Sequence, residues 1–366
     1  MSLINSQLAL FMTFSSIIIQ WYNKNKRNLP WRHTKDAYKI WLSEIILQQT
    51  RVKQGLPYYN RFVEKFPTVH DLARSKESVV IKAWQGLGYY SRARNLHGSA
   101  KFISQTLKGK FPNNYDEIKK LKGIGDYTAA AIISFAFNQP YPVVDGNVYR
   151  VLSRYFGIKT PIDSTKGKKE FSKKANLLID RKEPGTYNQA IMEFGALQCV
   201  PQNPDCNKCP LQKSCTAFSK DMVDLLPIKS KKGKIRTRYF NYLVMKRNGK
   251  ILIKKRIEND IWKNLYDFPL IETNKPVSRT QLSKLVSDKN ISIKTSSDTV
   301  KHILSHQIIL AKFWEAGFSK PVVSPLYKDN KDTVYITESQ LAKFALPRLI
   351  EKYLAKKMQN DDFFEF

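Results

Sequence analysis

All four cysteines of this 366-residue chain lie in one short stretch, at Cys199, Cys206, Cys209 and Cys215. Four thiolates at this spacing can close a tetrahedral zinc site or hold a cubane iron-sulfur cluster, and the spacing alone does not choose between them. Four unrelated core cysteines are the alternative, but clustering of this kind is typical of a metal site. The stretch is therefore predicted to fold around one metal centre, and it indicates that the protein works in a reducing compartment.

The chain before this stretch has the apolar periodicity of helices that end at Gly, Pro or Asn. Asp36 can cap the first clear helix, and Ile40, Trp41, Ile45 and Leu47 form its apolar side. Helices are expected near residues 37–50, 57–65, 77–85, 90–107, 114–121, 127–137, 147–156, 167–180 and 187–197. This part of the chain is predicted to be mainly α.

A segment with six positive charges, Lys229 to Arg238, separates this helical part from the rest. Beyond it, residues 239–247 and 250–256 alternate like strands, and Asn248-Gly249 between them is a strong hairpin signal. A further strand is expected over 308–315, and Thr337 with Gln340 resembles a capping box. Because the length exceeds one usual core, we predict two domains. Their limits are 1–227 for the helical domain, 228–238 for the linker and 239–358 for an α+β domain.

The charge of the chain points to a polyanionic partner. Sixty-two Lys and Arg against 31 Asp and Glu leave a formal charge of +31. Nucleic acid fits this surface best, and an anionic membrane is the weaker alternative because no long basic amphipathic helix is present. The apolar run from Leu8 to Ile19 is too short to span a bilayer and lacks the flanks of a signal peptide. We expect a core helix there, in a protein of the cytoplasm that binds no membrane.

A Gly-x-Gly turn at Gly123 and Gly125 lies between two expected helices. Glycine lets backbone N–H groups at a helix start approach a phosphate, although a tight turn between packed helices would use the same residues. Downstream, Asp145 precedes another expected helix, where an N-cap is its simplest role. Glu44 sits on or beside the apolar face of its helix. It could reach solvent from an edge, or it could be partly buried with a raised pKa and act as a general acid.

Several segments of the first 215 residues, taken in order, resemble the MutY family of DNA glycosylases within the endonuclease III superfamily. These are Leu29–Arg32 (base pocket), Trp41–Thr50 (catalytic-glutamate helix), Gly86–Arg94 (strand-wedging loop), Leu121–Ile132 (helix-hairpin-helix), Val144–Arg150 (catalytic aspartate), Tyr187–Gly195 (pre-cluster helix) and the cysteine stretch 199–215. The resemblance implies a two-lobed helix-hairpin-helix domain with a four-iron four-sulfur loop, followed by a Nudix-like recognition domain. No Nudix box is present in the sequence to hold magnesium.

The resemblance also implies the reaction. The substrate would be double-stranded DNA in which adenine is mispaired with 8-oxoguanine or guanine, bound by a monomer at the nucleoid. Glu44 would protonate the flipped adenine, Asp145 would stabilise the oxocarbenium-like sugar, and Tyr127 would support that site. Bifunctional relatives carry a lysine where this chain has Tyr127, so we predict a monofunctional glycosylase. The implied substrate-binding residues are Arg27, Trp31, Arg32, Gln49, Thr50, Leu87, Tyr89, Gly123, Gly125, Asn147, Gln189, Ser305 and His306.

One departure and three alternatives stay open at this point. Family members commonly have an aromatic residue where this chain has Leu304, which puts the stacking part of 8-oxoguanine recognition in doubt. The closest alternative is an endonuclease III-like pyrimidine glycosylase. The second is a DNA-binding redox sensor without base excision, and the third is zinc in place of iron.

Overall fold

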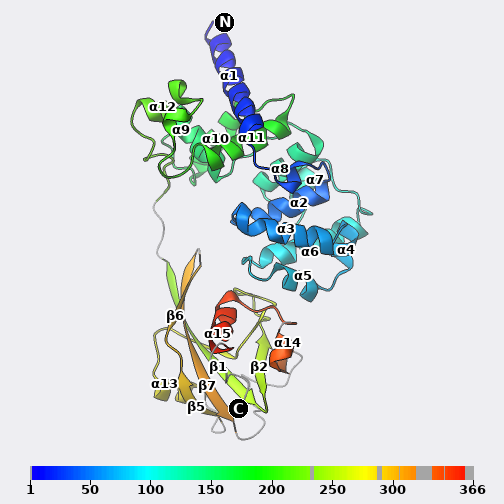
Figure 1. Cartoon of the computed structure of the whole chain (residues 1–366), viewed down its shortest axis with the longest axis vertical. Coiled ribbons are helices and arrows are strands. Elements are labelled where there is room, and N and C mark those ends of the chain that lie inside the picture. Colours follow the sequence, from blue (N-terminus) through cyan, green and yellow to red (C-terminus); the bar gives the residue numbers. More distant parts are fainter. Residues whose placement is uncertain are drawn as a thin grey trace. The chain divides into compact units, whose positions relative to one another are not determined.

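The computed structural model describes residues 2–230, 235–286, 291–304, 306–318, 332–341 and 343–358 (Figure 1). Its contacts divide the chain into two compact units, one made of residues 1–74 and 98–232 and the other of 75–97 and 233–366. The domain limits expected from the sequence stay a prediction. Residues 231–234 of the expected linker lie outside the described residues.

The expected helices are confirmed, with small shifts at their ends. The observed helices, which also include α4 and α12, are α1 (Ser2–Asn25), α2 (Ala37–Leu47), α3 (Val52–Lys65), α4 (Val69–Arg74), α5 (Glu77–Trp84), α6 (Ser91–Gln105), α7 (Tyr115–Lys120), α8 (Asp126–Phe137), α9 (Gly146–Phe156), α10 (Thr165–Leu178), α11 (Pro184–Leu197) and α12 (Thr216–Ser219). Helix α2 ends three residues before the expected position, because Gln48 leaves the helical conformation and Gln49 adopts a left-handed φ of 54°. The short α4 was not expected, since one turn and a half shows no clear periodicity.

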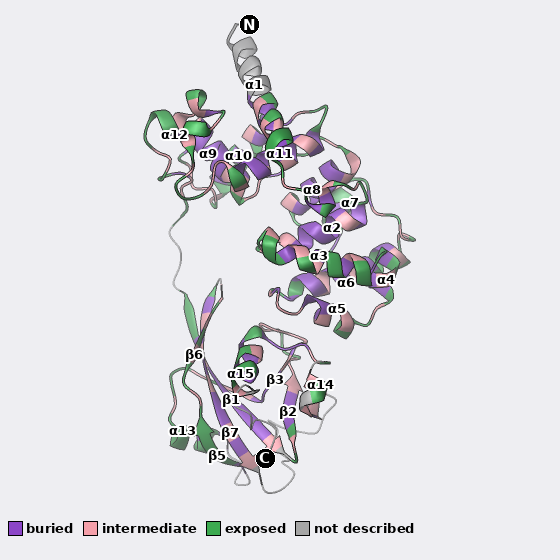
Figure 2. Cartoon of the chain, in the orientation of Figure 1, coloured by how far each residue is buried: buried purple, intermediate pink, exposed green. Residues whose placement is uncertain are grey.

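The core of the helical unit is built around α8. Residues Thr128 to Phe135 of this helix are all buried, and α8 packs against α2 and α11 (Figure 2). Helix α1 also packs on α11, and Phe14 and Ile18 of the expected apolar run are buried. No helix of the described residues is long and apolar enough to cross a membrane.

The second unit contains a mixed sheet centred on two long strands. The bounds are β1 (Arg236–Arg247), β2 (Lys250–Lys255), β3 (Tyr266–Asp267), β4 (Leu270–Thr273), α13 (Arg279–Val286), β5 (Ile291–Ser296), β6 (Val300–Ile303), β7 (Gln307–Phe318), β8 (Thr333–Ile336), α14 (Glu338–Leu341) and α15 (Arg348–Met358). The expected hairpin is confirmed, because β1 and β2 pair antiparallel through Asn248 and Gly249, both at positive φ. The β7 strand was also expected, and it pairs parallel to β1.

Alternation along β1 assigns its side chains to two cores. Phe240, Tyr242 and Val244 pack in a cluster that includes α15, whereas Leu243 and Met245 pack in a second cluster that includes α13. The sheet is therefore covered on both faces, as the period of two in the sequence requires. One half of the expected capping box is observed: the Gln340 side chain accepts a hydrogen bond of 3.1 Å from the Thr337 amide, whereas the Thr337 hydroxyl contacts the Ser339 hydroxyl at 3.0 Å.

Candidate active site

A pocket of about 950 Å³ opens in the helical unit, between residues of α2, α8, α9 and α11. Ten of the residues implied by the sequence line it: Arg27, Trp31, Arg32, Glu44, Gln49, Thr50, Tyr127, Asp145, Asn147 and Gln189. These residues come from segments far apart in the chain, from Arg27 to Gln189. The fold thus gathers most of the expected site into one cavity.

Glu44 reaches this pocket from the apolar side of α2. The Asp36 carboxylate caps the helix by accepting a hydrogen bond of 2.9 Å from the Tyr38 amide, which fixes where the helical turns begin. Glu44 is only 7% exposed, so the edge position facing solvent is excluded. Burial raises its pKa to about 7; a hydrogen bond from Tyr127 lowers it, and the nearby charge of Asp145 raises it. Near neutral pH, this carboxyl can therefore hold a proton.

Asp145 combines the capping role with a place in the pocket. Its Oδ1 accepts a 2.8 Å hydrogen bond from the Val148 amide at the start of α9, and its Oδ2 accepts one of 2.9 Å from the Asn147 side chain. Burial raises the pKa of Asp145, while these hydrogen bonds and the Arg150 charge act in the opposite direction. The N-cap is thus confirmed, and it leaves the carboxylate facing the same cavity as Glu44.

Tyr127, in the first turn of α8, lines the same pocket as the two carboxyl groups. Its hydroxyl hydrogen-bonds to Glu44 and lies 3.9 Å from the Met192 sulfur. Burial, followed by the charges of Glu44 and Asp145, raises the pKa of Tyr127 well above its ordinary value. The hydroxyl therefore stays protonated and can donate a hydrogen bond.

A second buried glutamate, Glu193 on α11, was missed by the sequence reasoning. Its carboxylate accepts hydrogen bonds from Arg32 at 2.7 and 2.8 Å and from Arg27 at 2.5 and 2.9 Å. Burial raises the pKa of Glu193, but these bonds outweigh it and bring the pKa to about 2. Its position four residues after Gln189 on an expected helix was the only sequence signal, because the arginine partners are distant in the chain.

Comparison with known proteins agrees with this arrangement. Residues 42–177 match the model of the HhH-GPD superfamily base excision DNA repair proteins, and residues 241–356 match that of the NUDIX domain. The chain is 35% identical over 346 residues to the adenine DNA glycosylase of Buchnera aphidicola subsp. Schizaphis graminum, covering 93% of this chain and 97% of that relative. The chain belongs to the adenine DNA glycosylases. An Arabidopsis thaliana adenine DNA glycosylase is 38% identical over 297 residues, which are 70% of this chain and 47% of that relative.

Solved structures resemble the helical part of this glycosylase. A thermostable thymine-DNA glycosylase matches with a TM-score of 0.54 and 31% identity over 57% of this chain and 97% of its own. Endonuclease III in a DNA complex matches with a TM-score of 0.51 and 23% identity over 59% of this chain, which supports the fold alone. The endonuclease III alternative is therefore wrong for the whole chain, because the adenine glycosylase relative also matches the C-terminal part.

The helix-hairpin-helix turn of the glycosylase lies outside the pocket. Gly123 has a left-handed φ of 82°, and Gly125 is the N-cap of α8. Among the described residues, no atom that would clash lies within 4 Å of the position that a Cβ would take at Gly125, so that side of the start of α8 is open. This geometry suits a phosphate group, as the sequence indicated.

The four cysteines lie in one loop beside α9. Their thiols are partly buried, and burial, followed by their mutual charges, raises the pKa of Cys206. Arg154 on α9 places its Nη1 3.5 Å from the Cys199 sulfur, and the Arg150 Nε donates a 2.7 Å hydrogen bond to the Cys199 carbonyl. Among the residues that the structure describes, no three His, Cys, Asp or Glu side chains adopt a metal-binding arrangement.

The remaining expected residues lie in the second unit. Leu87 is 6% exposed and Tyr89 is 43% exposed, so only the tyrosine projects from the loop between α5 and α6. His306 is exposed at the start of β7, and Ser305 lies outside the described residues. Leu304 packs against the core cluster that includes α15, so it does not extend from the loop as an aromatic wedge would.

Proposed function

We propose that this glycosylase flips adenine out of a pair with 8-oxoguanine or guanine, hydrolyses its N-glycosidic bond and leaves the DNA strand intact. The observation that carries the proposal is the pair of unlike carboxyl groups, Glu44 and Asp145, in one pocket. An N-glycosidic bond breaks readily when the base leaves neutral and the positive charge on the sugar is stabilised. One acid and one anion meet both requirements.

The hydrogen bonds favour Glu44 as the acid. Asp145 accepts bonds from the Val148 amide and the Asn147 side chain, and both stabilise its ionised form. The ionised form of Glu44 is stabilised by a hydrogen bond from Tyr127, and the nearly complete burial of the side chain disfavours that form more strongly. A proton shared by two neighbouring carboxyl groups therefore resides on Glu44, and Asp145 keeps its negative charge.

The pocket supplies a fixed acceptor for the base. Glu193 is ionised between Arg27 and Arg32, and it lines the cavity together with Trp31 and Gln189. The exocyclic amino group of adenine is a hydrogen-bond donor, which an ionised carboxylate accepts well. We propose that adenine enters with its amino group towards Glu193 and its ring nitrogen N7 towards Glu44.

Asp145 and Tyr127 would act at the deoxyribose, where positive charge develops during the reaction. As the glycosidic bond lengthens, positive charge grows on the sugar, and the Asp145 carboxylate stabilises it or bonds to it transiently. The Tyr127 hydroxyl would orient Glu44 through the hydrogen bond between them. Water then completes the hydrolysis.

The absence of an amine at position 127 supports a monofunctional enzyme. Strand cleavage by β-elimination requires a Schiff base between an amine and the abasic sugar. We expect borohydride to trap little protein on DNA, and Tyr127→Lys to increase trapping. Strong trapping of the unmodified enzyme would refute this part, and a Lys53→Gln variant would then test the exposed lysine that also lines the pocket.

We further propose that Cys199, Cys206, Cys209 and Cys215 hold a four-iron four-sulfur cluster. The support is the donor set: four thiols in one loop, with the Arg154 guanidinium at Cys199 to balance thiolate charge. When bound, the cluster would supply rigidity to a loop that contacts DNA. A brown protein with visible absorption supports iron, whereas a colourless protein that contains zinc would refute it.

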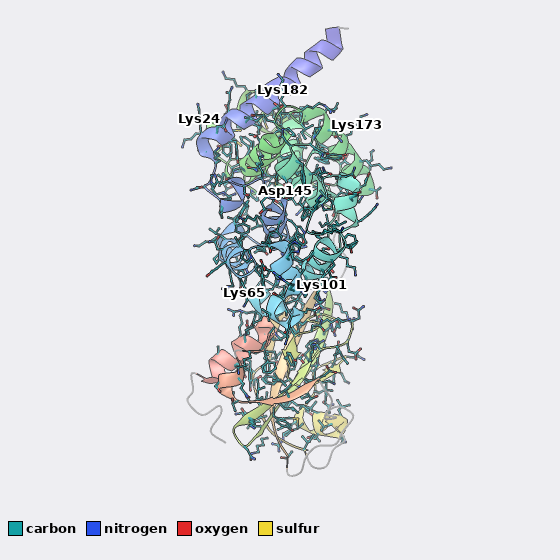
Figure 3. All side chains as sticks on the ribbon, turned by 90° about the vertical axis from the view of Figure 1, so that its right-hand side faces the viewer. Lys24, Lys65, Lys101, Asp145, Lys173 and Lys182 are labelled. Atoms are coloured by element: carbon teal, nitrogen blue, oxygen red, sulfur yellow. The ribbon has the colours of Figure 1, made fainter. Side chains whose placement is uncertain are left out.

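DNA is the partner that the surface supports. Exposed lysines such as Lys24, Lys65 and Lys173 surround the unit that contains Asp145 (Figure 3). The loop from His302 to His306 in the second unit is our candidate for reading 8-oxoguanine, through hydrogen bonds from Ser305 and His306 rather than through stacking.

The deciding experiment uses labelled duplexes with one adenine opposite 8-oxoguanine or guanine, followed by alkali to reveal abasic sites. We expect alkali-dependent cleavage at the adenine, its loss in Glu44→Gln, and full activity in Glu170→Gln, which changes an exposed glutamate of α10. Tight binding without release of any base would instead support the DNA-binding sensor. Release of oxidised pyrimidine from a control duplex, with adenine left intact, would also overturn the proposal.

A further inference from the structure

The loop between α5 and α6 has an unusual backbone. Gly86, Gly88 and Tyr89 all have positive φ values, of 97°, 74° and 47°. The two glycines adopt this conformation without cost, but a tyrosine there is strained by about 1 kcal/mol or more. Local contacts must therefore hold the loop in this shape.

Arg92 supplies the contacts that span the loop. It lies in the first turn of α6 and is 9% exposed, and its Nη2 lies 3.3 Å from the carbonyl oxygens of both Leu87 and Gly88. The same guanidinium lies over the rings of Trp84, at 4.9 Å, and Tyr89, at 5.7 Å. One cation thus joins the end of α5, the middle of the loop and the exposed tyrosine.

Two further hydrogen bonds stabilise the loop around the Arg92 guanidinium. The Trp84 indole donates a 3.0 Å hydrogen bond to the Gly88 carbonyl, and the Gly86 amide donates one of 3.2 Å to the Tyr90 hydroxyl. Burial lowers the pKa of Arg92 to about 10, so the guanidinium stays charged at neutral pH. A planar, charged fork can bind two carbonyls and stack on rings at once, which a lysine cannot do.

We infer that Arg92 is a positioning residue for base flipping, which holds Tyr89 ready to enter the DNA stack. The inference rests on the proposed role of this loop as the strand wedge. Insertion of a side chain into a duplex costs a few kcal/mol of unstacking. A loop that is already ordered does not add its own conformational entropy to that cost, which would be about 1–2 kcal/mol for each residue fixed.

The test compares Arg92→Gln with Lys101→Gln in the full-length enzyme. Both changes remove one charge from α6, but Lys101 lies on the exposed face (Figure 3). Single-turnover excision is measured on a fully paired duplex and on one whose flanking mismatches already unstack the adenine. In parallel, 2-aminopurine at the adenine position reports unstacking by its fluorescence.

We expect Arg92→Gln to slow both unstacking and excision on the paired duplex by about tenfold, the factor that about 1.4 kcal/mol corresponds to. Most of the loss should disappear on the unstacked duplex, and Lys101→Gln should match the unmodified enzyme on both. An unchanged rate, or an equal loss on the two duplexes, would overturn the inference. If thermal unfolding shows that Arg92→Gln does not fold, Arg92→Lys replaces it in the same comparison, because it keeps the charge and loses the fork.

Tyr89→Ala separates this inference from the proposed function. If the Tyr89→Ala variant flips and excises adenine at the normal rate, the loop is not the wedge, and its proposed role in base flipping is wrong. If Tyr89→Ala is slow while Arg92→Gln is normal, only the positioning role fails. With both roles correct, the double variant is no slower than Tyr89→Ala alone, since Arg92 acts through the tyrosine.

Discussion

Two glutamates in the same pocket, Glu44 on α2 and Glu193 on α11, differ in how readily they hold a proton near neutral pH. Both are almost completely buried, at 7% and 1% exposure. Glu193 contacts two arginines and has a pKa of about 2, whereas Glu44 has a tyrosine hydroxyl as its hydrogen-bond donor and a pKa of about 7. Burial by itself would raise the pKa of both glutamates. The difference between the two pKa values therefore comes from the arginine partners of Glu193. One wall of the pocket therefore offers a proton, and the other offers a fixed negative charge.

Removal of the anion should have the largest effect. Asp145→Asn is expected to reduce single-turnover excision about 1,000-fold or more, because the sugar loses its stabilising charge. Asparagine caps a helix as well as aspartate does, so the thermal unfolding of the variant should be nearly unchanged. Asp116→Asn in the exposed first turn of α7 is the matched control. Activity within tenfold of the unmodified enzyme would contradict the assignment.

Glu193→Gln should destabilise the protein by about 3 kcal/mol, since it leaves the charges of Arg27 and Arg32 without their anion. Urea unfolding at neutral pH measures this change. If the free energy of unfolding falls by less than about 1 kcal/mol, the two arginines do not depend on Glu193, and the proposed contrast between the two glutamates weakens.

The rate of excision should fall as the pH rises through about 7, because Glu44 must carry a proton to act as the acid. At pH 9 the single-turnover rate is expected to be about 100-fold below its value at pH 6, as one ionisation predicts. A flat rate between pH 6 and pH 9 would show that another group donates the proton.

Glu44→Gln should stabilise the fold at high pH. The pKa of Glu44 rises from 4.5 to about 7 on folding, so the folded state binds the proton more tightly and stability falls as the pH rises through that window. The variant should therefore gain about 3 kcal/mol at pH 8 and almost nothing at about pH 3, where both states are protonated. Thermal unfolding at the two pH values checks this, and a loss of stability at pH 8 would be inconsistent with a buried, unpaired charge.

Asp36→Ala should have the smallest effect, about 1 kcal/mol of stability, because it removes the cap of α2. The pH dependence of excision should keep its midpoint, since the surroundings of Glu44 do not change. A shifted midpoint would show that the helix start controls the acid directly. Asp36→Asn, which retains a capping side chain, is the control.

Local patterns predicted most of the fold. Periodicity located α2, α8 and α9, and Asn248-Gly249 located the β1–β2 hairpin, because these features depend on residues close together in sequence. The parallel pairing of β1 with β7 was not predictable, since its register depends on packing between strands about 70 residues apart. Glu193 was missed for the same reason, as its partner Arg27 is 166 positions away. The early end of α2 at Leu47 was not predicted, because no glycine or proline follows it and the left-handed residue there is Gln49.

The long separation between Arg27 and Glu193 also bears on how the enzyme is made. At translation rates of about 5–20 residues per second, Arg27 is added to the chain roughly 10 to 30 seconds before Glu193. Until then the part of α1 that packs on α11 in the finished structure lacks that partner. Newly made chains should therefore bind chaperones during this interval, and a ribosome that stalls before α11 releases a chain without a complete base pocket.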